Sequence, residues 1–105
     1  MAKKLEPITP GEILLEEFMK PMGITQAKLA RDINVPPNRI SQIIHGKREI
    51  TADTALRLGK YFGIEPEFWL NLQMRYNIKM AKRTVGQRIE KEVRVCDIME
   101  KAKAA

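Results

Sequence analysis

The sequence predicts an all-α protein of five helices in one domain, on three observations. Threonine or proline stands before each of five segments whose apolar residues recur at three- and four-residue spacing. Glycine or proline follows the first four of these segments, where a helix would end. The chain has 105 residues, of which 44% are hydrophobic, so it suits one domain with a core of its own.

The composition excludes several classes of protein. No apolar run approaches the roughly 20 residues of a membrane span, and the N-terminus turns polar at once. Cys96 is the only cysteine, so neither an intrachain disulfide nor a cysteine-based zinc cluster is expected. We therefore expect a cytoplasmic protein with no cofactor, bound metal or membrane partner.

The first two helices have clear boundaries in the sequence. Thr9 and Pro10 are expected to begin the first helix, which Pro21 and Gly23 are expected to stop. Thr25 begins the second, which runs to about residue 34. Its inward side chains include a small alanine that would let two helices cross closely.

The third helix is predicted from about Pro37 to His45, and it has two unlike faces. Its three isoleucines lie on one side, and the opposite face carries hydrogen-bonding side chains rather than the Glu and Lys usual on a solvated face. From Thr25 to Arg48 the chain carries five cationic side chains against one carboxylate. This excess of positive charge indicates a phosphate-binding surface, although many solvated faces are also basic.

The fourth and fifth helices are predicted from Thr51 to Gly63 and from Pro66 to about Ala81. The fifth is apolar on two sides, and a small domain covers one such stripe by itself. One stripe includes Trp69, which we expect in the core of the monomer. The other predicts a two-fold dimer interface, unless the C-terminal tail covers it. Its residues are Leu70, Met74 and Ile78.

These boundaries predict an N-terminal arm (1–8), a helical domain (9–81, with the helix pair at about 25–45) and a C-terminal extension (82–105) of uncertain structure. A partial alternation from Ile89 to Val95 suits a short strand, and the charged residues around it suit a helix equally. The last few residues are expected to be mobile.

Particular motifs give the chain a family resemblance. It resembles the helix-turn-helix of the phage-repressor-like (Xre) regulators in Thr25-Gln26-x-x-Leu29-Ala30, Val35, Ile40-Ser41 and Ile44-x-Gly46-Lys47-Arg48. It also resembles the HigA-type antitoxins of bacterial addiction modules. That likeness lies in Pro10-Gly11-Glu12-Ile13-Leu14, Ile50-Thr51-Ala52-Asp53-Thr54-Ala55 and Phe68-Trp69-Leu70-Asn71-Leu72-Gln73.

This resemblance implies a lambda-repressor-like domain that binds its own double-stranded operator DNA as a homodimer. It also implies a HigB-type toxin partner, which cleaves messenger RNA on the ribosome. A stand-alone Xre-family repressor without a toxin is the alternative, and the same DNA face serves both. The toxin-binding surface stays open between the N-terminal arm, the tail and several helices together.

In such a module the third helix enters the major groove and its outward side chains meet base edges. Asn38 and Gln42 are the strongest candidates, because an amide pairs with adenine through two hydrogen bonds. The base-reading candidates are Pro37, Asn38, Arg39 and Gln42, of which Pro37 offers only apolar contact and departs from the polar residue common there. The phosphate-contact candidates are Gln26, Lys28, Ser41, Lys47 and Arg48.

An enzyme is not expected. His45 is the only histidine and Cys96 is distant from it in sequence, so no nucleophile and base can be paired. The chain contains neither a glycine-rich phosphate loop nor a metal-spaced cluster.

Overall fold

The computed structural model describes residues 6–98, and within this range the chain is helical with no strand. Its elements are α1 (Pro10–Ile13), η1 (Leu14–Met19), α2 (Lys20–Met22), α3 (Gln26–Ile33), α4 (Pro37–Ile44), α5 (Ala52–Phe62) and α6 (Pro66–Glu92). Since α1, η1 and α2 form one continuous helix, the predicted all-α class with five helices is confirmed. Residues 1–5 of the arm and 99–105 of the extension lie outside the described residues. Nowhere between residues 6 and 98 is a helix both long and apolar enough for a bilayer crossing.

The first helix begins as predicted but passes through Pro21. The backbone N–H of Glu12 donates to Thr9 Oγ1 (3.1 Å), and Thr9 N–H donates to Glu12 Oε1 (3.0 Å). The prediction that Pro21 stops the helix was wrong, since α2 continues to Met22 and Gly23 ends it. Pro21 cannot donate to the preceding turn, and the widened π-helical turn of η1 directly before it takes up the distortion.

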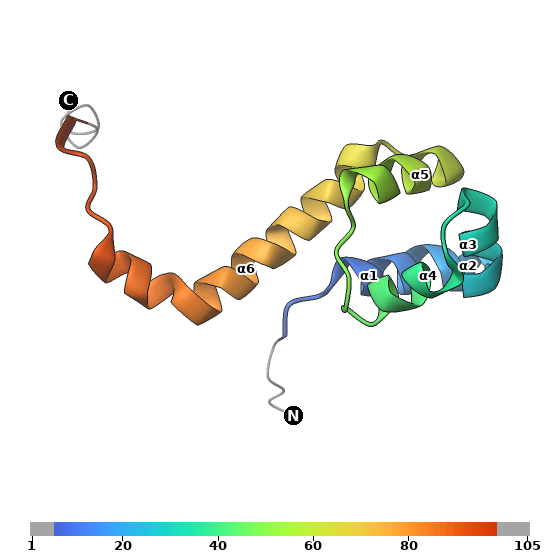
Figure 1. Ribbon diagram of the computed structural model, residues 1–105, viewed down its shortest axis with the longest axis horizontal. Helices are drawn as coiled ribbons and strands as arrows, with labels where there is room; N and C mark the ends of the chain where they lie inside the picture. Colours follow the sequence, from blue (N-terminus) through green and yellow to red (C-terminus); the bar gives the residue numbers. More distant parts are fainter. Residues whose placement is uncertain (1–5, 99–105) are drawn as a thin grey trace.

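The core lies where α3, α4 and α5 meet the first helix and the start of α6 (Figure 1). Trp69 is fully buried there, as predicted, and its ring contacts Phe18, Phe62 and Phe68 at centroid distances of 4.9, 6.1 and 5.0 Å. Buried aromatic rings contribute large apolar areas, so this cluster fixes α6 against the first helix and α5.

Gly11 allows α1 and α4 to touch. A Cβ at this position would lie 1.9 Å from the carbonyl oxygen of Ile43 and 2.8 Å from Cα of Ile44. Any side chain would therefore push the backbone of α4 away from α1. The position of α4 in the fold depends on this close approach.

α6 is longer than predicted, because it continues to Glu92 instead of ending near Ala81. The prediction overlooked that residues 82–92 contain no proline, and a single Gly86 weakens a helix without stopping it. Thr84 Oγ1 donates to the carbonyls of Met80 and Ala81 (3.2 Å each), a bond that bends helices. Figure 1 shows α6 bending within its C-terminal half and leaving the body of the molecule as an arm. The strand alternative for residues 89–95 is thereby excluded.

Candidate nucleic-acid interface

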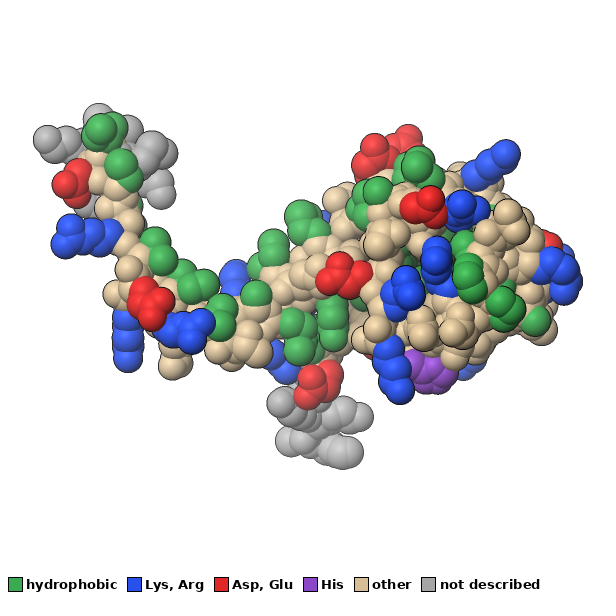
Figure 2. Space-filling view, in the orientation of Figure 1, with side chains coloured by type: hydrophobic (Ala, Val, Ile, Leu, Met, Phe, Trp, Pro, Cys, Tyr) green, Lys and Arg blue, Asp and Glu red, His purple; other side chains and the backbone are tan. Residues whose placement is uncertain are grey.

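α4 separates apolar and polar side chains as the sequence predicts. Ile40, Ile43 and Ile44 are buried, at 0%, 1% and 9% exposure. Asn38 and His45 are exposed on the outer side. Figure 2 shows Lys and Arg side chains on the surface beside the single histidine. α4 thus carries an outward row of hydrogen-bonding groups within a cationic surround.

The start of α4 is open. Pro37 occupies the first helical position, and no side chain of residues 6–98 caps this end of the helix with a hydrogen bond. Pro37 and Asn38 are both exposed. The positive end of the helix dipole at an exposed helix N-terminus favours a negatively charged group.

The end of α4 brings together four of the candidate residues. Gly46 has a φ of +73°, which turns the chain sharply. Arg48 then returns beside α4 and donates from Nε to Gln42 Oε1 at 3.0 Å. Ser41 lies one residue before Gln42 and is half-buried, and Lys47 is exposed. One predicted base-reading residue, Gln42, therefore lies beside three predicted phosphate-contact residues, Ser41, Lys47 and Arg48.

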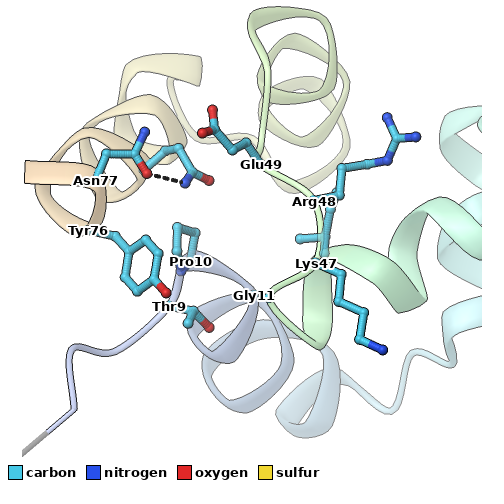
Figure 3. Close-up of a pocket in the computed structure, with 11 residues that line it drawn as sticks. Thr9, Pro10, Gly11, Lys47, Arg48, Glu49, Tyr76 and Asn77 are labelled. Carbon is cyan, nitrogen blue, oxygen red and sulfur yellow. Dashed lines mark hydrogen bonds between the residues drawn. The ribbon is translucent and has the colours of Figure 1, made fainter. Parts of the chain in front are cut away.

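Gln73 is a residue of this region that the sequence analysis missed. It is 8% exposed, and its Oε1 accepts a hydrogen bond from Ile50 N–H (2.8 Å). Its Nε2 donates to Asn77 Oδ1 (3.0 Å), the bond dashed in Figure 3. Since Trp69 is predicted buried, a polar residue four positions later on the same helix face was the available signal. Gln73 ties the loop that carries Lys47 and Arg48 to α6.

Lys47 and Arg48 point out of the cleft between this loop and α6. Figure 3 shows both side chains extending away from Tyr76 and Asn77, which line the opposite side of the cleft. Both cations are thus presented on the outer side of the loop.

The two candidates on α3 lie apart from this group. Gln26 is half-buried at the start of the helix, next to the capping Thr25. Lys28 forms an ion pair with Asp32 (2.9 Å), and Tyr61 donates to the same carboxylate (2.7 Å). The hydrogen bond from Lys28, followed by that from Tyr61, lowers the pKa of Asp32, and the Asp32 carboxylate raises the pKa of Lys28. Lys28 already has an anionic partner.

Arg39 is turned toward α5 more than the sequence predicts. The side chain is half-buried, and its Nε is buried without a hydrogen-bond partner among the described residues. Its charge contributes to lowering the pKa of Asp53, where the hydrogen bond from Arg57 is the main cause. Arg57 also donates to the carbonyl of Ile33 (2.9 Å), which joins α5 to the end of α3. Arg39 is therefore less available to a base edge than Asn38.

The candidate dimer residues on α6 divide into two kinds. Leu70 is half-buried and packs against the core, whereas Met74 and Ile78 are 50% and 48% exposed. Further along, Val85 and Ile89 follow Met74 and Ile78 at a spacing of eleven residues, and Ile89 is 48% exposed. Eleven residues are three helical turns, so these side chains share one face of α6.

Comparison with known proteins assigns the family. The model of the Helix-turn-helix family HTH_3 matches residues 15–69. A solved HigA-family addiction-module antidote protein from Coxiella burnetii is 52% identical, with a TM-score of 0.83, over 88% of this chain and 100% of that one. The chain belongs to the helix-turn-helix family and its HigA-type antitoxin branch. The structure of the Pseudomonas aeruginosa antitoxin HigA with the higBA promoter is 42% identical with a TM-score of 0.83, over 85% of this chain and 97% of that one.

A further relative has a less specific name. Virulence-associated protein I of Dichelobacter nodosus is 50% identical over 80 residues, which are 76% of this chain and 74% of that protein. The HigA-type family consists of DNA-binding antitoxins and regulators and is not an enzyme family.

Proposed function

We propose that this chain is the antitoxin of a HigBA-type module. It binds operator DNA as a dimer, represses its own operon and neutralises a ribosome-dependent toxin that cleaves messenger RNA. The polar outward face of α4, in a chain of the HigA-type family, is the observation that carries this proposal. The solved relative that contains a promoter supports the DNA-binding part of it.

In the proposed complex α4 lies in the major groove with its N-terminus foremost. Asn38 and Gln42 then reach base edges, and Pro37 offers an apolar contact. Lys47 and Arg48 hold the DNA backbone at the other end of α4. Gln26, Ser41 and the N-terminal amides of α3 add hydrogen bonds to phosphate. We rank Lys28 and Arg39 below these, because Lys28 is paired with Asp32 and the Nε of Arg39 is buried.

Two substitutions separate base reading from phosphate contact. Gln42→Ala is expected to weaken operator binding and to relax the preference at one base pair of each half-site, by about 1–3 kcal/mol. Lys47→Ala is expected to weaken binding to all sequences and to reduce the slope of log K against log salt by about one. Fluorescence anisotropy titrations at several salt concentrations measure both. Unchanged operator affinity in Gln42→Ala would show that α4 is docked differently.

The proposed dimer uses the exposed apolar face of α6. Met74, Ile78, Val85 and Ile89 extend over about 22 Å of helix, at 1.5 Å for each residue. A contiguous exposed apolar face of this kind is typical of a protein–protein contact. Figure 2 shows apolar side chains along the α6 arm, outside the body of the molecule. The proposed function requires that two copies paired along this face present their α4 helices to one side of a DNA duplex.

The toxin partner is tested by co-expression. The gene next to the one encoding this chain is expressed alone and together with it, and growth and co-purification are measured. The proposal expects arrest of growth by the neighbour alone, rescue by this chain, and a stable complex of the two proteins. A neighbour that neither stops growth nor co-purifies would refute the antitoxin role and leave a stand-alone repressor.

A further inference from the structure

Gln42 and Arg48 are joined by a hydrogen bond across the end of α4. Arg48 Nε donates to Gln42 Oε1 at 3.0 Å. We propose that Arg48 determines base specificity through Gln42, because this bond fixes which end of the Gln42 amide faces the DNA. The inference rests on the proposed DNA-binding function, and it gives Arg48 a role beyond phosphate contact.

The backbone around Arg48 is fixed at both ends. On one side, Lys47 N–H donates to the Gln42 carbonyl at 2.8 Å, so Gln42 holds this loop with its main chain as well as its side chain. On the other side, Ile50 N–H is bound by the buried amide of Gln73. Arg48 is therefore presented to Gln42 by a braced turn.

Fixing the amide matters because its two ends have almost the same shape and opposite chemistry. One end accepts hydrogen bonds and the other donates them, and a half-turn of the terminal torsion exchanges the two. To bind adenine with two hydrogen bonds, the amide oxygen must accept from the N6 amino group while the amide nitrogen donates to N7. An amide that turns freely can also donate to guanine or accept from cytosine. A Gln42 side chain without a fixed orientation would discriminate poorly.

Arg48 can hold only one of these two orientations. A guanidinium has donors and no acceptor, so it binds the oxygen end of the amide and never the nitrogen end. The bond is also charge-assisted and therefore stronger than one between neutral groups. With Oε1 held by Arg48, the Nε2 donors of Gln42 keep one direction, and the terminal Nη groups of Arg48 remain available for a phosphate.

Arg48→Lys is the variant that separates this role from simple phosphate contact. Lysine keeps the positive charge but places a methylene group where arginine has Nε. Arg75→Lys is the matched control, since it makes the same substitution at an exposed arginine of α6 that lies outside the proposed DNA-binding residues. Both positions are exposed, so the fold is expected to be retained.

The test begins with the wild-type chain and a library of randomised DNA duplexes. The selected site, and the base pair at which Gln42→Ala relaxes the preference, define the position to be measured. The dissociation constants of all variants are then compared on four duplexes that differ only at that base pair. The slope of log K against log salt is measured for each variant.

Arg48→Lys is expected to keep the salt slope of the wild type and to lose roughly tenfold of the discrimination at this base pair, within the range that one bidentate contact supplies. The double variant, which combines Arg48→Lys with Gln42→Ala, is expected to lose no more discrimination than Gln42→Ala alone. Arg75→Lys is expected to keep both the discrimination and the salt slope of the wild type. Unchanged discrimination in Arg48→Lys, or no base pair that responds to Gln42→Ala, would overturn the inference. A wild-type chain that selects no sequence would instead overturn the proposed DNA binding, and the inference with it.

Discussion

Gln73→Leu tests whether the buried amide of α6 holds the loop that follows α4. Ile50 is 2% exposed and its N–H has Gln73 Oε1 as acceptor at 2.8 Å. Leucine fills nearly the same space, so the substitution leaves little cavity and removes only the polar partners. An orphaned buried N–H costs about 1–3 kcal/mol. In a domain of this size each kcal/mol lowers the Tm by roughly 4–8 °C.

Thermal unfolding followed by circular dichroism measures this effect. Asn77→Ala is the matched control, because it removes the second, exposed partner of Gln73 and leaves the bond to Ile50 intact. We expect it to change the free energy of unfolding by no more than about 0.5 kcal/mol. Equal Tm values for Gln73→Leu and Asn77→Ala would refute the reasoning, since the bond to Ile50 would then contribute nothing.

Three further predictions concern the fold, the pH dependence and the dimer. Gly11→Ala is expected to lower the free energy of unfolding, measured in urea, by at least about 1–3 kcal/mol, because its Cβ meets the Ile43 carbonyl. Gly86→Ala is the control, because its Cβ has only ordinary contacts. It is expected to raise the free energy of unfolding by up to about 1 kcal/mol. Equal stability of the two variants would contradict the close approach. Asp32→Asn is expected to lower the Tm at pH 7, and this difference should disappear as the pH falls below about 4, because a carboxylate with a lowered pKa stabilises only while ionised. A Tm difference that persists at pH 2 would show that the ionised Asp32 carboxylate is not the source of the lost stability. Ile78→Lys is expected to give monomers in sedimentation equilibrium, and a stable dimer would exclude this face.

Helix boundaries and the core could be predicted from the sequence because they depend on local chemistry. Thr9, Thr25 and Thr51 each cap a helix where expected, since a hydroxyl before an apolar-periodic segment is a local signal. The faces of α4 followed from the spacing of its isoleucines. Trp69 was predicted buried because so large an apolar ring is rarely left in water.

The parts that escaped prediction depend on contacts between distant residues or on weak local signals. The bond between Gln73 and Ile50 joins residues 23 positions apart, so no periodicity announces it. Arg48 returns to Gln42 only because Gly46 turns the chain. The end of α6 was misplaced because the partial alternation from Ile89 to Val95 suits a strand as well as a helix, although the eleven residues after Ala81 contain no proline. Helix periodicity does not determine which side chains contact bases, because these contacts depend on how α4 docks into the groove.

The proposed function requires two copies of α4, held by one dimer, to bind a two-fold symmetric operator. Its most direct test is selection of randomised duplex DNA by the full chain, followed by measurement of the mass of the complex on the selected site. We expect two inverted half-sites with centres about one helical turn apart, roughly 34 Å, bound by two chains. A single unrepeated half-site bound by one chain, or no selected sequence at all, would contradict it.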